Sequence, residues 1–305
     1  MLGFVFCDSV THLNNNFFFS LVNYSTNYAV LHYFSLEFFQ YGDPMKNLPL
    51  VLFIIPFLAG CGANNTPPQT PIPGEKTSAK LRTLETGATV IQSRPPVDAI
   101  STYLDGFHFY NGDKNGQMEA HHYVTVLNED VMQAVIYDGN TKDARLMGVE
   151  YIISEHLFKT LPAEEKKLWH SHQYEVKSGS LVAPGLPQVA DKALMSKIVN
   201  TYGKTWHTWH TDRDKTLPMG IPALMMGFTG EGQLDPVLLA DRDRRLGIDS
   251  KAIKRERQDL PAHPVITGAN AWVEGEIIQL QRVRGSGEHG RGDTTHFGAS
   301  EQSRK

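Results

Sequence analysis

The strongest constraint on what this chain can fold into is a short apolar segment that ends in the motif Leu-Ala-Gly-Cys at Cys61. Lys46, directly after Met45, supplies a positive charge, and residues 48–57 are continuously apolar. A membrane-spanning helix needs about 20 such residues, so this stretch fits the hydrophobic part of an export signal. We therefore expect residues 45–60 to be a lipoprotein signal peptide and Cys61 to be the cysteine that receives lipid.

The residues after Cys61 support this interpretation over a short buried helix in which the cysteine is merely apolar. Residues 62–71 are polar and rich in proline, a composition that cannot continue a packed helix and is typical of a tether. We expect residues 61–96 to be a flexible linker and the chain to be anchored by lipid in the cell envelope. Gly62, rather than Asp, follows the cysteine, which favours the outer membrane if the cell is Gram-negative.

The two ends of the chain differ from its middle. Residues 1–44 contain no Lys or Arg and show neither helical nor strand periodicity. Two interpretations are open: an aromatic arm that seeks membranes, or a spurious N-terminal extension upstream of a true start at Met45, which we favour. Residues 282–305 are rich in glycine and polar residues and predict a disordered tail.

Composition excludes several classes of function. The net charge of −4, without a run of basic residues and interleaved aromatics, predicts no nucleic-acid partner. Only two cysteines are present, Cys7 and Cys61, so neither a disulfide scaffold nor a thiolate metal site is expected. The zinc-helix, nucleophile-elbow and phosphate-loop motifs are missing as well. An enzymatic function is therefore uncertain and disfavoured.

Residues 97–281 form the expected globular domain. Apolar spacing predicts a helix over 97–108, and Val-, Ile- and Tyr-rich segments predict strands at 121–127, 131–138, 145–153 and 172–177. Further strands are expected at 205–210 and 223–228, and helices after Pro162 and at 190–201, 236–246 and 250–258. The expected fold class is α+β, a single domain with a mostly antiparallel sheet and surrounding helices.

Histidines and carboxylates suggest a metal site within this domain. Adjacent residues of a strand point to opposite faces, so at most one of His121 and His122 can join any site. We hypothesise that one of them joins other imidazoles and a carboxylate around a divalent transition metal. The candidate ligands are His121, His122, His170, His172, Glu119 and Glu175. The alternative, which we favour, is that these rings only hydrogen-bond within a partly buried layer, with no cofactor.

Long stretches of the domain resemble the oil-body-associated protein family. They are GFHFYNGDKNGQMEAHHYVTVLNEDVMQAVIYD, DARLMGVEYIISEHLFKTLPAEEKKLWHSHQYEVKSG and TYGKTWHTWHTDRDKTLPMGIPALMMGFTGEGQL, within residues 97–265. The resemblance implies contact with a lipid surface and implies no reaction or catalytic residue. The chain departs from the plant pattern by its signal and lipobox, and so resembles a bacterial lipoprotein member.

These observations lead to two hypotheses about function. In the first, a lipid-anchored envelope protein binds lipid or an envelope protein partner at a membrane surface, without catalysis. In the second, the histidine cluster makes a metal-binding protein or a metal-dependent enzyme.

Overall fold

A computed structural model of the chain describes residues 18–25, 28–35 and 65–283. The chain divides into two compact units, residues 1–59 and residues 60–305. In the first unit, β1 (Phe18–Ser25) and β2 (Tyr28–Ser35) form a two-stranded antiparallel sheet, although this stretch shows no strand periodicity. The signal peptide, Cys61 and nearly all of the expected tail lie outside the described residues.

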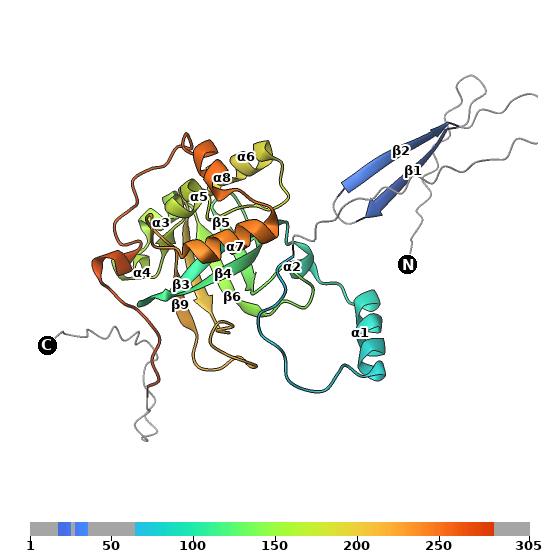
Figure 1. The fold of residues 1–305 in the computed structure, drawn as a ribbon, viewed down its shortest axis with the longest axis horizontal. Helices are drawn as coiled ribbons and strands as arrows, with labels where there is room; N and C mark the ends of the chain where they lie inside the picture. Colours follow the sequence, from blue (N-terminus) through green and yellow to red (C-terminus); the bar gives the residue numbers. More distant parts are fainter. Residues whose placement is uncertain (1–17, 26–27, 36–64, 284–305) are drawn as a thin grey trace, which may run out of the picture. The chain divides into compact units, whose positions relative to one another are not determined.

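The second unit is built around a closed antiparallel barrel (Figure 1). Its strands follow the order β6-β5-β4-β3-β9-β8, and β8 pairs with β6 to close the ring. The bounds are β3 (Thr102–Tyr110), β4 (Asp113–Val126), β5 (Val131–Tyr137), β6 (Leu146–Ile153), β8 (Tyr202–His207) and β9 (Ala223–Met226). A two-residue strand, β7 (His170–Ser171), lies beside the start of β8. The predicted α+β class with a mostly antiparallel sheet is confirmed.

Helices surround the barrel and begin at recognisable signals. Ser154 caps α3 through its hydroxyl, and Asp235 caps α7 directly before a proline at the first helical position. Figure 1 shows α5, α6 and α8 gathered at one end of the barrel, with α7 lying across its side. The bounds are α3 (Glu155–Thr160), α4 (Ala163–Lys166), α5 (Gln173–Ser178), α6 (Gln188–Ile198), α7 (Pro236–Leu246), α8 (Ser250–Glu256) and a 3₁₀ turn (Ala271–Glu274).

Two apolar clusters cover the two faces of the barrel wall, one inside the barrel and one outside it. The first plugs the barrel end beneath α5 and α6 and includes Leu104, Val124, Val176 and Ile198. The second lies on the outer wall under α7, around Phe107, Phe109, Leu224, Met226 and Phe228. Strand β3 therefore contributes side chains to buried layers on both of its faces.

This double burial explains why the predicted helix over 97–108 is wrong. Helix α2 (Pro95–Asp98) ends at once, and Thr102–Tyr110 is a strand. A strand that is buried on both faces loses the alternation of apolar and polar residues, so its apolar spacing can imitate a helix.

The predicted strand over 172–177 is also wrong. Pairing stops after Ser171, and the chain turns into α5, which ends at Gly179 in the left-handed conformation with φ 78°. The turn places Glu175 three residues after His172 in the first turn of a helix, rather than across a strand from it.

The predicted linker contains more structure than its composition suggested. Helix α1 (Ala79–Ile91) lies within it, although none of its residues is buried. Nearer the lipobox, Thr66 and Thr70 are buried against the barrel unit. We call residues 66–70 the strap.

Among the helices that the structure describes, none is both long and apolar enough to cross a membrane.

Candidate metal centre

A cluster of histidines and carboxylates fills the middle of the barrel. Strand β3 contributes His108, β4 contributes His122 and β6 contributes Glu150, and the strand register turns all three inward. His170 on β7 and His172 directly before α5 approach from beside β8. All five side chains are nearly or completely inaccessible to solvent.

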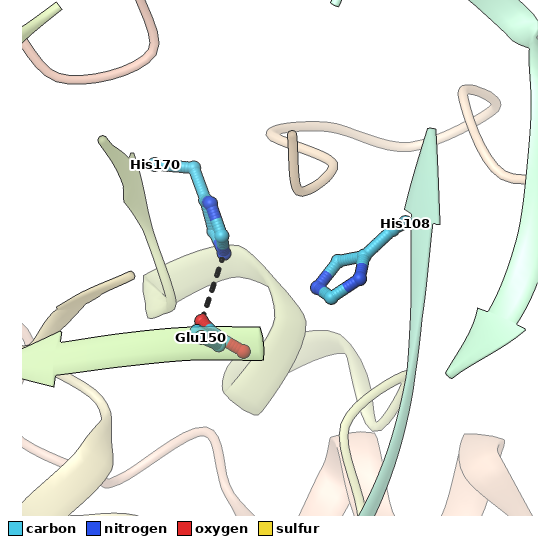
Figure 2. Close-up of side chains that lie close together, drawn as sticks. All are labelled: His108, Glu150 and His170. Atoms are coloured by element: carbon cyan, nitrogen blue, oxygen red, sulfur yellow. Dashed lines mark ion pairs between the residues drawn. The ribbon is translucent and has the colours of Figure 1, made fainter. Parts of the chain in front are cut away.

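Glu150 is the centre of this cluster. Its Oε2 lies 3.0 Å from Nε2 of His122, and its Oε1 lies 3.0 Å from Nε2 of His172. Nε2 of His170 lies 3.5 Å from the same Oε1 (Figure 2). His108 faces the same space from the opposite wall, and one of its ring nitrogens lies within 4.8 Å of donor atoms of both Glu150 and His170. One carboxylate therefore gathers imidazoles from three separate elements.

Hydrogen bonds around Thr201 fix the tautomer of His172. The Thr201 hydroxyl donates to the carbonyl oxygen of Ile198 at 2.7 Å, so it can only accept from Nδ1 of His172, 2.8 Å away. Nδ1 therefore carries a hydrogen, and Nε2 of a neutral His172 presents its lone pair to Glu150. Two acceptors 3.0 Å apart repel each other unless a proton or a metal cation lies between them.

Several neighbouring polar atoms have no hydrogen-bond partner among the described residues. They include both ring nitrogens of His170, Nδ1 of His122, Nδ1 of His207 and the hydroxyl of Thr205. Buried polar groups are normally satisfied, because an unsatisfied one costs about 1–3 kcal/mol. A neutral imidazole has one N–H and one lone pair, so one of the two orphaned nitrogens of His170 is an acceptor without an electrophilic partner.

Burial and charge separate the protonation states of these groups. Burial lowers the pKa of His170 to about 3 and that of His207 to about 3, and it lowers the pKa of His108 well below its usual range. Burial opposes ionisation of Glu150, but its close contacts with His122 and His172 outweigh burial and hold its pKa well below the usual value. Neutral His108 and His170 beside an ionised Glu150 are in the protonation states that metal ligands require.

Glu175 lies at the edge of the cluster. Its Oε2 is 4.0 Å from Nε2 of His170. Burial, and then repulsion by Glu150, raise the pKa of Glu175 well above its usual value. A cation beside it would reverse this and favour ionisation.

The space available limits what the centre can hold. A cavity of about 10 Å³ adjoins His108, His122, Glu150, His172 and Glu175. That volume matches about one water molecule or one ion and leaves no room for an organic substrate.

Glycines make this space. A Cβ at Gly203 would overlap the carboxylate of Glu150 and lie 2.8 Å from Nε2 of His172. One at Gly227 would lie 2.9 Å from Glu175 and from the His170 ring. The backbone therefore approaches the cluster more closely than any larger residue would permit.

The donor set fits a divalent transition metal. Ligand atoms about 2.1 Å from a tetrahedral ion lie about 3.4 Å from one another. The separations of 3.0, 3.0 and 3.5 Å involve both oxygens of Glu150 and leave space for such an ion. One donor atom each of His108, Glu150 and His170 lie within 4.8 Å of one another, as do those of His170, His172 and Glu175. Imidazole nitrogens with one carboxylate suit Zn²⁺, Fe²⁺, Ni²⁺ or Cu²⁺ rather than Mg²⁺ or Ca²⁺.

The predicted residues His121 and Glu119 lie on the opposite face of β4 and do not reach the centre. Nδ1 of His121 is 3.1 Å from Asp105, and Glu119 forms an ion pair with Arg245. Arg242 pairs with Asp105 at 2.7 Å. Two guanidinium groups pair with these carboxylates and fasten α7 to the barrel, although Asp105, Glu119 and His121 also lie close enough together to hold a metal ion.

The structure thus brings together His122, His170, His172 and Glu175 of the predicted set and adds His108, Glu150 and His207. Nδ1 of His108 lies 3.4 Å from Nε2 of His207. Glu150 had one usable signal in the sequence: it is the single charged residue of the otherwise apolar strand β6. A lone carboxylate on the buried face of an apolar strand needs a partner.

Comparisons with known proteins place the chain in a family context. Residues 94–261 match the family described as "Protein of unknown function (DUF1264)". Oil body-associated protein 1B of Arabidopsis thaliana is 41% identical over 217 residues, covering 70% of this chain and 89% of that protein. Oil body-associated protein 1A of Zea mays is 42% identical over 214 residues, covering 70% and 90%. No solved structure gives a significant match.

Proposed function

The chain belongs to the DUF1264 family and is a homologue of the plant oil body-associated proteins, and we propose that its barrel binds a single divalent transition-metal ion. His122, His170, His172 and Glu150 hold the ion, with His108 and Glu175 close enough to complete its coordination. Since the cavity accommodates only an ion or one water molecule, the metal serves binding and stability rather than turnover of an organic substrate.

One observation carries this proposal: Nε2 of His172 faces the carboxylate of Glu150 while Nδ1 is already committed to Thr201. A hydrogen bond from the ring nitrogen that faces away from the metal is the usual way in which a protein orients a ligating histidine. The competing explanation is a proton in place of the metal, which would make His172 an imidazolium. That alternative still leaves both nitrogens of His170 without a partner, whereas a metal satisfies one of them.

Thermal unfolding of the chelated full chain tests this function. Bound metal stabilises the fold in proportion to its saturation, by about 4 kcal/mol at 1,000 times the dissociation constant. We expect stoichiometric Zn²⁺, Fe²⁺, Ni²⁺ or Cu²⁺ to raise the unfolding temperature of the chelated protein by several degrees.

His122→Gln should abolish this rise, whereas His121→Gln should keep it. The two histidines are adjacent and both buried, but only His122 faces the centre. A chain that none of the four metals stabilises, or an equal response of both variants, would contradict the metal centre.

The sequence further leads us to propose that this domain is displayed at a membrane of the cell envelope by lipid on Cys61. Support comes from the lipobox and the export signal before it, and from relatives whose names associate them with oil bodies. The outer membrane is the expected location if the cell is Gram-negative.

Replacing Cys61 by Ser tests the anchor. In cells fed a radiolabelled fatty acid, the wild-type chain should be labelled and recovered with membranes, and Cys61→Ser should carry no label. Persistent labelling of Cys61→Ser would refute the anchor.

A further inference from the structure

We propose that residues 215–221, which we call the docking loop, insert into the surface of the lipid bilayer to which Cys61 is attached. This inference rests on the proposed anchor and is independent of the metal centre. It assigns a membrane-facing end to the barrel.

The docking loop exposes apolar side chains that the core does not use. Leu217 is 50% exposed, Met219 is 62% exposed and Ile221 is 37% exposed. The continuation of the same segment is buried in β9, where Leu224 is completely inaccessible. The loop is therefore the part of this apolar segment that lacks a partner within the described fold.

The strap joins the start of the mature chain to the base of this loop. The hydroxyl of Thr70 donates to the carbonyl oxygen of Thr211 at 2.9 Å, and Nε of Arg145 donates to the carbonyl oxygen of Thr70 at 3.2 Å. At the other end of the strap, the amide of Thr66 donates to Oδ1 of Asn140 at 2.7 Å.

The length of chain between the anchor and the strap limits how far the loop can lie from lipid. Five residue steps separate Cys61 from Thr66 and span at most about 18 Å when fully extended. Since Thr66 is held on the barrel, the end of the barrel that carries the strap and the docking loop must stay near the bilayer. Strand β8 runs from the end of the barrel that carries α6 to the opposite end, where the docking loop follows. Helix α6 therefore faces away from the bilayer.

The chemistry of the loop suits an interfacial position. Pro218 fixes one backbone angle of the loop, and Gly220 adopts the left-handed region with φ 79°, which favours glycine. A cavity of about 420 Å³ opens beside the loop and is lined by Ile221, Ile277 and Leu280 together with the polar Asp113, His210 and Arg213. The anchor supplies the affinity, and the loop sets the orientation, because a tethered domain meets the surface at high effective concentration.

Depth-dependent fluorescence quenching tests this placement. The mature lipidated protein, in which Cys61 carries lipid, would have Met219→Cys as its one free thiol, labelled with a bimane dye. The protein is reconstituted into vesicles of phosphatidylcholine and phosphatidylglycerol with or without brominated acyl chains. The matched control is Val189→Cys on α6, where the native side chain is 84% exposed.

We expect brominated lipid to quench the dye at position 219 at least twofold and to leave the dye at position 189 unchanged. Equal, weak quenching at both positions in protein that carries the acyl label would overturn the docking loop and leave the anchor standing. Shielding of position 219 from water without quenching by lipid would also overturn it, because a protein would then cover the loop. Absence of the acyl label would overturn the anchor and this inference together.

Discussion

The adjacent residues His121 and His122 lie on opposite faces of one strand and therefore have different surroundings. His122 faces the interior and contacts Glu150, whereas His121 faces α7 and contacts Asp105 and Glu119. Arginines pair with the carboxylates around His121, whereas no arginine or lysine of the described chain pairs with Glu150. The same residue type is thus a structural hydrogen-bonding group at one position and a candidate ligand at the next.

Thr201→Val tests the orienting role assigned to Thr201. The substitution removes the acceptor for Nδ1 of His172 while keeping the shape of the side chain, so the ring is no longer held in one tautomer. Metal affinity, measured by competition with a chelating dye, should fall by about 10- to 100-fold in folded protein. Thr125→Val is the control, because Thr125 lies on the face of β4 opposite to that of His122. A loss of affinity equal in the two variants would contradict this role.

At the scale of elements, the centre depends on the point where β7 gives way to α5. His170 is the first residue of β7, and His172 and Glu175 belong to the turn and the helix that follow. A continuous strand would have sent Glu175 away from His172, as the alternation of side chains predicts. The break in the strand brings His172 toward Gly203 of β8 and Glu175 toward Gly227, and these glycines leave room for the two side chains.

Gly203→Ala tests whether this close approach is required. The added Cβ would overlap the Glu150 carboxylate, so the variant should lose metal binding and about 1–3 kcal/mol of stability through overpacking. Gly230→Ala is the control: its added methyl group would lie no closer than 3.4 Å to any neighbouring atom, so metal binding and stability should both stay unchanged. Dye competition and urea unfolding measure the two effects. Normal metal affinity in Gly203→Ala would show that the cluster is looser than the structure indicates.

Sequence patterns predicted the parts of this architecture in which one periodicity dominates. Strands β5 and β6 and helices α6, α7 and α8 occur where alternation or capping signals placed them. The pattern failed at β3, which is buried on both faces, and at α5, which is a helix of only six residues. Opposite orientations of His121 and His122 followed from alternation alone. The pairing of β6 with β8 places Glu150 among the histidines. This pairing joins strands that are distant in sequence, so the local spacing of residues could not predict it.

At the scale of the whole molecule, the interior and one end of the closed barrel carry the two proposed functions, metal binding and membrane contact. Its interior holds the cluster of histidines and carboxylates. Its end opposite α6 carries the strap and the docking loop, which we propose to meet the membrane. Because the candidate ligands come from β3, β4, β6 and β7, a bound metal would fasten elements that are distant in sequence and stabilise the barrel as a unit.

Elemental analysis of the full chain, purified from membranes in detergent without added metal or chelator, tests the central claim most directly. About one equivalent of a single first-row transition metal should accompany each wild-type chain and each His121→Gln chain, and His122→Gln should contain almost none. Fully folded wild-type protein without bound transition metal, which also fails to take one up after chelation and refolding, would contradict the metal centre.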